Sequence, residues 1–268
     1  VCSIWHATSR SPHAMRQQLY GICPSMHEKI QINTDVTIRR EAISEDYDCV
    51  IVDDFLQDPH ELVEYAARHA SEFSMPERGN YPGPLFRVDG NAMTDIYRFI
   101  RSKMTKHFPF LRANMKLWTY FSIATLRPDE LSYLQRICHT DPTSAPGRRC
   151  YAALLYLFEN EGLGGTGFYR WREPELVLKA KAIERKDPGN SLAFLQEHFP
   201  TYRKPACYMT GSNEIAELLC TIPARFNRLV FYSGNVPHSA AITAPELLSG
   251  DAQKGRLTLN IFADVLPR

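Results

Sequence analysis

The chain has 268 residues, of which 44% are hydrophobic and 23% are charged, so it is long enough to bury a substantial core. Its 31 basic and 30 acidic residues nearly cancel and form no long basic stripe, which argues against nucleic acid or a membrane surface as a partner. No apolar run is long enough to cross a bilayer, the first residues lack a secretory pattern, and the seven cysteines include no C-x-x-C pair. We therefore expect a soluble, cytoplasmic protein with reduced cysteines and a function that resides in a pocket.

Residues 1–115 are expected to form an N-terminal arm and supporting helices. The β-branched run at 49–52 favours one strand, and helices are expected over about 58–73 and 93–106. Asp58 is placed to cap the first of these helices, because it precedes a proline at the first helical turn.

From residue 116 onward the pattern changes to alternating bulky and small residues rich in strand formers, which indicates a β core over 116–268. Strands are predicted over 117–124, 135–139, 150–158, 167–171, 228–233 and 256–262. Residues 173 to about 220 are expected to form a helical and loop-like insert. Together these elements predict one α+β domain over 1–268 with a mainly β core.

Two imidazoles and one carboxylate are available at spacings that suit a metal site. His139 and Asp141 would share one face of a strand, because alternate side chains point the same way. His238 follows the apolar run 229–232, so a second strand is expected to bring a third ligand. This is the ligand set typical of a non-haem iron centre. The alternative is an ordinary hydrogen-bonded His–Asp pair, since an isolated H-x-D tripeptide is common.

The order of several motifs resembles that of the Fe(II)- and 2-oxoglutarate-dependent dioxygenases. The motifs are H-x-D at 139–141, Gly164-Gly165-Thr166 before a strand, His238, and Gly255-Arg256-Leu257-Thr258. More narrowly, H-x-D, GGTGFYR, NRL, the later His and GRLTLN resemble an uncharacterised bacterial family, a domain of unknown function, over roughly residues 48–264. The resemblance implies a double-stranded β-helix (jelly-roll, cupin-like) with flanking N-terminal helices and a helical insert.

The resemblance also implies a cofactor and a co-substrate. His139, Asp141 and His238 would bind Fe(II), with dioxygen and 2-oxoglutarate as co-substrates. In such enzymes an arginine followed two residues later by Ser or Thr binds the distal carboxylate of 2-oxoglutarate, and Arg256 and Thr258 match that pattern. Tyr156 is a further candidate for a hydrogen bond to 2-oxoglutarate, with an ordinary core aromatic as the alternative.

The implied reaction is hydroxylation of an unactivated C–H group, or its desaturation or cyclisation, with release of succinate and CO2. The substrate would be a small molecule, an amino acid or a peptide, and Arg170, Trp171 and Tyr81 are the predicted substrate contacts. Two alternatives stay open: a catalytically silent jelly-roll binding module, and a metal-dependent cupin enzyme that does not use 2-oxoglutarate. The sequence determines neither the substrate nor the oligomeric state.

Overall fold

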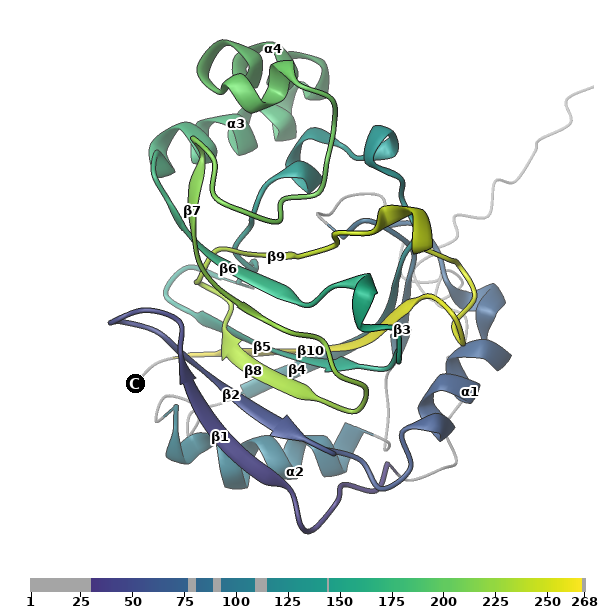
Figure 1. Ribbon diagram of the computed structural model, residues 1–268. Coiled ribbons are helices and arrows are strands. Elements are labelled where there is room, and N and C mark those ends of the chain that lie inside the picture. Colours follow the sequence, from purple (N-terminus) through teal and green to yellow (C-terminus); the bar gives the residue numbers. More distant parts are fainter. Residues whose placement is uncertain (1–29, 77–80, 89–92, 109–114, 144, 267–268) are drawn as a thin grey trace, which may run out of the picture.

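The computed structural model describes residues 30–76, 81–88, 93–108, 115–143 and 145–266. Within these ranges the chain is mostly β-sheet with few helices (Figure 1). The strands are β1 (Thr37–Ala42), β2 (Asp48–Asp53), β3 (Leu85–Val88), β4 (Met115–Ala124), β5 (Arg149–Tyr156), β6 (Thr166–Trp171), β7 (Ala216–Ile222), β8 (Leu229–Ser233), β9 (His238–Ala240) and β10 (Arg256–Val265). The α-helices are α1 (His60–Arg68), α2 (Met93–Lys103), α3 (Pro174–Lys186) and α4 (Pro188–His198).

A seven-stranded antiparallel sheet has the order β1-β2-β8-β5-β10-β4-β3. One of its interior strands, β10, alternates between two environments, as the period of a strand requires. Leu257, Leu259 and Ile261 belong to the main apolar core, whereas Arg256 and Asn260 line a pocket on the opposite face. The sheet therefore separates a structural face from a site-facing side.

Helices α1 and α2 cover the structural face of this sheet (Figure 1). Aromatic rings join the layers, with Phe55 against Phe99 at 5.1 Å and Tyr65 against Phe121 at 6.0 Å between ring centroids. Asp58 caps α1 as predicted, because its Oδ1 accepts a hydrogen bond from the backbone N–H of His60 at 3.1 Å. This packing fixes the sheet on which the site is built.

A three-stranded sheet of order β7-β6-β9 lies across the site-facing side of the large sheet (Figure 1). The two sheets share an apolar cluster in which the ring of Phe168 on β6 meets that of Tyr232 on β8 at 4.9 Å. These two sheets and the helices beside them confirm the predicted mainly β core with flanking helices. The more specific assignment to a double-stranded β-helix stays a prediction. Helices α3 and α4 pack on one another beyond β7 around Val177 and Leu195.

The structure corrects three sequence expectations. The strand predicted over 135–139 is wrong, because Tyr133–Arg136 form a 3-10 helix whose capping box joins Ser132 and Gln135. The predicted insert ends in strand β7 rather than remaining helical to about 220. The β core also begins before residue 116, since β1, β2 and β3 pair into the large sheet.

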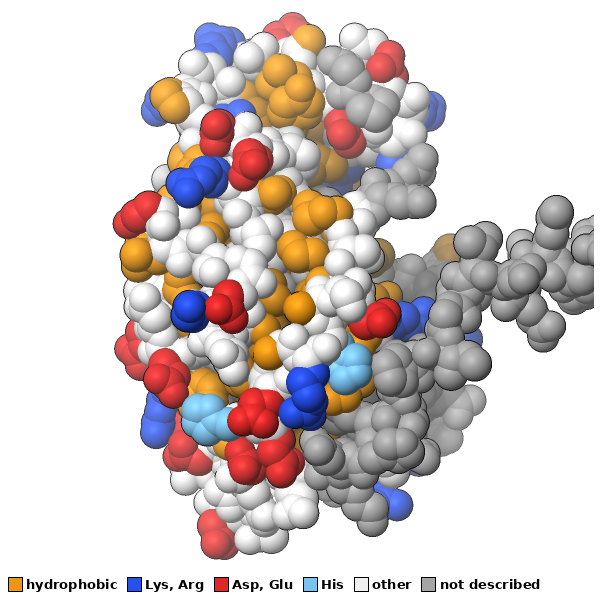
Figure 2. Space-filling model, turned by 90° about the vertical axis from the view of Figure 1, so that its right-hand side faces the viewer, with side chains coloured by type: hydrophobic (Ala, Val, Ile, Leu, Met, Phe, Trp, Pro, Cys, Tyr) orange, Lys and Arg blue, Asp and Glu red, His pale blue; other side chains and the backbone are white. Residues whose placement is uncertain are grey.

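The surface carries charges of both signs. On the face drawn in Figure 2, acidic and basic side chains of the described residues are interspersed with apolar ones. Among the described residues, no helix is both long enough and apolar enough to span a membrane.

Candidate active site

The structure brings His139, Asp141 and His238 together, and we call these three residues the triad. One candidate ligand atom from each lies within 4.8 Å of those of the other two. His238 opens β9, and an isolated antiparallel bridge joins it to His139, with N–H···O distances of 2.9 and 2.8 Å. The 139–141 segment is extended rather than part of a regular strand, yet the i, i+2 spacing still presents both side chains to one point.

Hydrogen bonding prepares His238 as a metal ligand. Its Nδ1 donates to the Val236 carbonyl oxygen at 2.8 Å, because a carbonyl can only accept. Its Nε2 is thereby left for another partner, and the carboxylate oxygen Oδ1 of Asp141 lies 3.6 Å away, too far for a hydrogen bond. Burial lowers the pKa of His139 well below its ordinary value, so that imidazole is neutral at pH 7.

Asp141 is buried, and its Oδ2 makes no hydrogen bond. Burial raises the pKa of this carboxyl, against the opposing effect of His238 and Lys181. An unsatisfied buried acceptor is costly unless something binds it. Two imidazoles beside such a carboxylate fit a divalent metal ion of the Fe(II), Mn(II) or Zn(II) kind.

Gly234, in the turn between β8 and β9, sets the position of Asp141. The Asp141 N–H donates to the Gly234 carbonyl at 2.8 Å. A Cβ atom at Gly234 would lie 2.6 Å from Asp141 Oδ2 and 2.9 Å from Asp141 Cβ. Only glycine leaves the carboxylate in this position.

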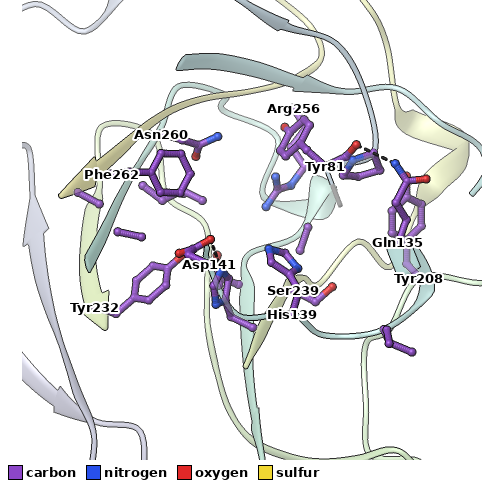
Figure 3. Close-up of a pocket in the computed structure, with 18 residues that line it drawn as sticks. Tyr81, Gln135, His139, Asp141, Tyr208, Tyr232, Ser239, Arg256, Asn260 and Phe262 are labelled. Atoms are coloured by element: carbon purple, nitrogen blue, oxygen red, sulfur yellow. Dashed lines mark hydrogen bonds and ion pairs between the residues drawn. The ribbon is translucent and has the colours of Figure 1, made fainter. Parts of the chain in front are cut away.

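Arg256 is 1% exposed, and it lies beside the triad in the same pocket (Figure 3). Its guanidinium donates to three backbone carbonyls, from Nε to Leu163 at 3.1 Å and Gly164 at 3.3 Å and from Nη2 to Gly165 at 2.9 Å. Among the described residues, no carboxylate forms an ion pair with it. A buried cation held only by neutral acceptors leaves a positive charge that favours an anion beside it.

The two glycines of the Gly164-Gly165 motif allow these carbonyls to reach Arg256. Gly164 has a φ of 83°, and a Cβ there would lie 2.0 Å from the Ala241 carbonyl oxygen. A Cβ at Gly165 would lie 2.0 Å from the Ile222 carbonyl oxygen. The two glycines therefore position the Arg256 guanidinium through their backbone carbonyls and contribute no side chain to the pocket.

The hydroxyls of Tyr81 and Thr258 lie beside one another and beside the guanidinium of Arg256. Both are buried and make no well-formed hydrogen bond to the protein. Burial raises the pKa of Tyr81, against the opposing charge of Arg256, so the phenol keeps its proton and can donate. Tyr81 lines the pocket, and its predicted contact with substrate stays a prediction.

Three predicted site residues do not face the pocket. Tyr156 is fully buried, and its hydroxyl pairs with Thr166 Oγ1 at 2.7 Å. Arg170 is exposed, and its side chain lies 3.6 Å from that of Glu217, its paired neighbour on β7. Trp171 packs toward the helical insert, where its indole N–H lies 3.1 Å from Cys138 Sγ.

Other pocket residues were not predicted. Asn260 and Phe262 face the site from β10, and the i, i+2 rule applied onward from Arg256 and Thr258 identifies both. Tyr232, on the same face of the large sheet as Phe262, also lines the pocket, and its ring lies 4.9 Å from that of His238 (Figure 3). Nothing in the local sequence distinguishes this tyrosine from a core aromatic, because its role depends on the pairing of β8 with β5.

Comparison with known proteins gave one family match and several distant structural similarities. No curated protein sequence matches the chain significantly. A prolyl 4-hydroxylase from Phytophthora capsici is 14% identical at a TM-score of 0.40, over 81% of this chain, and the chain spans 58% of that protein's length. EvdO2 from Micromonospora carbonacea var. aurantiaca is 11% identical at a TM-score of 0.40, over 81% of this chain and 86% of that one. The non-heme alpha ketoglutarate dependent epimerase SnoN from nogalamycin biosynthesis is 14% identical at a TM-score of 0.38, over 80% and 77%.

Similarity at that level assigns no chemistry, whereas the family match covers most of the chain. It extends over residues 34–263 and includes every strand of both sheets except the last residues of β10. This chain belongs to the family of unknown function DUF6445.

Proposed function

We propose that this protein is an Fe(II)- and 2-oxoglutarate-dependent oxygenase. The observation that carries the proposal is that one pocket holds both the triad and a buried guanidinium with no carboxylate partner among the described residues. A metal site alone, or an arginine alone, would fit many proteins. The combination fits a reaction that requires a metal and an anionic co-substrate side by side.

The triad would hold Fe(II) through two imidazole nitrogens and one carboxylate oxygen. The Val236 carbonyl accepts from Nδ1 of His238 and so leaves Nε2 for the metal, and burial keeps His139 neutral, so that this imidazole need not lose a proton to bind metal. Gly234 leaves room for the Asp141 carboxylate beside the candidate ligand atoms of the two histidines.

Arg256 would bind the distal carboxylate of 2-oxoglutarate, with the hydroxyls of Tyr81 and Thr258 as further donors. Hydrogen bonds to charged groups stabilise by about 1.5–3 kcal/mol each, and the three carbonyls behind the guanidinium hold it still in advance. Tyr81 thus takes the role that the resemblance gave to Tyr156, whose hydroxyl is occupied by Thr166.

The remaining walls would hold substrate and exclude water. Leu154, Ala152 and Phe262 provide an apolar lining next to the triad. When bound, iron and 2-oxoglutarate couple decarboxylation of the keto acid to succinate with oxidation of a nearby C–H group by dioxygen. Hydroxylation, desaturation and cyclisation are all compatible with this pocket, as are a small molecule, an amino acid or a peptide as substrate.

Replacement of Arg256 separates this proposal from its two rivals. We expect Arg256→Ala to weaken 2-oxoglutarate binding by about 100-fold or more while Fe(II) affinity is retained, because two or more charge-assisted bonds are lost. Arg256→Lys should be intermediate, since an ammonium lacks the planar fork. The exposed Arg170→Ala serves as the control, and both affinities are measured by anaerobic calorimetry.

A cupin enzyme that does not use 2-oxoglutarate would bind metal but show no affinity for the keto acid even before substitution. A silent binding module would bind the keto acid without a requirement for metal. Either result would reject the proposed function.

A further inference from the structure

A row of four side chains crosses the site-facing side of the large sheet next to the triad. Trp118, Phe262, Ala152 and Tyr232 lie directly opposite one another on β4, β10, β5 and β8. Paired residues in adjacent antiparallel strands present their side chains on the same face. The last three of the four line the pocket that contains the triad (Figure 3).

Ala152 has the smallest side chain in this row, and it lies between two aromatic residues, Phe262 and Tyr232. Neighbouring strands are about 4.8 Å apart, so the positions of Phe262 and Tyr232 are separated by roughly 9 to 10 Å, two strand spacings. A flat ring packed between two others needs about 7 Å, which is two carbon contacts of about 3.5 Å each. We call the space over Ala152, between Phe262 and Tyr232, the slot.

Both walls of the slot are held by other rings. Trp118 stacks on Phe262, with 5.9 Å between centroids and 22° between planes. Tyr232 meets Phe168 and His238 edge to face, at 4.9 Å in each case. The walls are therefore prepared in advance, and a ligand ring would not have to order them.

The slot carries no charge of its own. In the adjoining row, Asp264 forms an ion pair with Arg148 at 2.8 Å, and Lys116 is exposed to solvent. On the other side, Leu154 and Asn260 form the next row toward Arg256. The Asp141 carboxylate of the triad acts on Tyr232 at the edge of the slot, so the slot disfavours an anionic group, and its apolar walls favour an uncharged, flat one.

We propose that the slot binds an uncharged aromatic ring of the substrate and thereby points an attached aliphatic carbon toward the triad. This inference rests on the proposed function, because it names the substrate class of the same site. The pocket already divides into two parts: an anion site at Arg256 for the keto acid, and the slot for the substrate. The contact of Tyr232 with His238 places the slot directly beside the metal ligands.

The test compares two small alcohols that differ in the flatness of their rings. Benzyl alcohol and cyclohexylmethanol are titrated separately into the full chain, and ligand-observed saturation-transfer NMR gives each dissociation constant. We expect benzyl alcohol to bind several-fold more tightly, because an aromatic ring makes ring–ring contacts with Phe262 and Tyr232 that a saturated ring cannot make. Phe262→Leu should weaken benzyl alcohol about three- to tenfold, and Ala152→Leu should abolish its binding by filling the slot. Tyr47→Leu, at an aromatic that is 39% exposed, should change nothing.

The wild-type comparison needs no variant, so a failure of one variant to fold does not remove the test. Equal affinity for the two alcohols, or unchanged benzyl alcohol affinity in folded Phe262→Leu protein, would overturn the slot. Anaerobic Fe(II) and 2-oxoglutarate affinities are measured on the same samples. If these ligands bind but benzyl alcohol does not, the slot alone fails. If benzyl alcohol binds and the Phe262 and Ala152 variants weaken it as expected, but 2-oxoglutarate does not bind, the slot is supported and the oxygenase proposal fails.

Discussion

Gly234 gives the sharpest prediction of how the fold controls the triad. In Gly234→Ala, the added methyl carbon would lie 2.6 Å from Asp141 Oδ2 and 2.9 Å from Asp141 Cβ. An ordinary carbon contact is about 3.5 Å, so the carboxylate must move by roughly 0.6 to 0.9 Å. Functional groups that bind metals tolerate displacements of only about 0.5 Å.

We therefore expect Gly234→Ala to weaken Fe(II) or Mn(II) binding by about 10- to 100-fold, the usual effect of disturbing a group that orients a ligand. Overpacking should also cost about 1–3 kcal/mol of unfolding free energy. Metal affinity is measured by anaerobic calorimetry, and stability by urea denaturation.

Gly211→Ala is the matched control, because a Cβ at Gly211 would meet no atom within 4 Å. This control should bind metal as the wild type does. If folded Gly234→Ala protein keeps wild-type metal affinity, Asp141 is not a ligand, or its position does not depend on the turn.

Three further substitutions test other parts of the site. Asp141→Asn should abolish metal binding while leaving the metal-free protein equally stable or more stable by about 1–3 kcal/mol in urea denaturation, because it removes a buried carboxylate oxygen without a partner; a large loss of stability would contradict this reading. Gly164→Ala should lower thermal stability and 2-oxoglutarate affinity together, since its Cβ would strike the Ala241 carbonyl and displace the loop that holds Arg256; unchanged keto-acid affinity would show that the loop does not position the guanidinium. Arg170→Ala should change the unfolding free energy by no more than about 0.5 kcal/mol and leave both affinities unchanged, because the side chain lies outside the pocket; reduced 2-oxoglutarate binding would contradict this placement.

Much of the β core could be predicted because it depends on local pattern. The runs that became β4, β5, β8 and β10 alternate or consist of strand formers, and the structure keeps them within a few residues. The i, i+2 spacing of His139 and Asp141, and that of Arg256 and Thr258, predicted shared faces that the structure bears out. These relations hold because side-chain direction along extended chain depends only on the parity of the position.

The errors arose where non-local contacts or a local competing bond override that parity. The stretch before His139 contains Ser132 and Gln135 at capping-box spacing, so it winds into a 3-10 helix. Arg170 shares the alternation of Phe168, but it lies near the end of β6 and is exposed beside Glu217, and the alternation of a single strand does not show where the layer that covers it ends. Tyr81 reaches the anion site from a distant loop that Gln135 anchors through a 2.8 Å bond to its carbonyl. Such a contact follows from the folded topology alone.

The most direct measurement of the central claim is an anaerobic titration of the protein with Fe(II) and 2-oxoglutarate, followed by visible absorption. A metal-to-ligand charge-transfer band appears only when the keto acid chelates iron held by the protein. We predict that the wild-type protein develops this band, and that Asp141→Asn and Arg256→Ala do not at the same ligand concentrations. Absence of the band from folded, iron-loaded wild-type protein would contradict the assignment of the triad and Arg256 to one oxygenase centre.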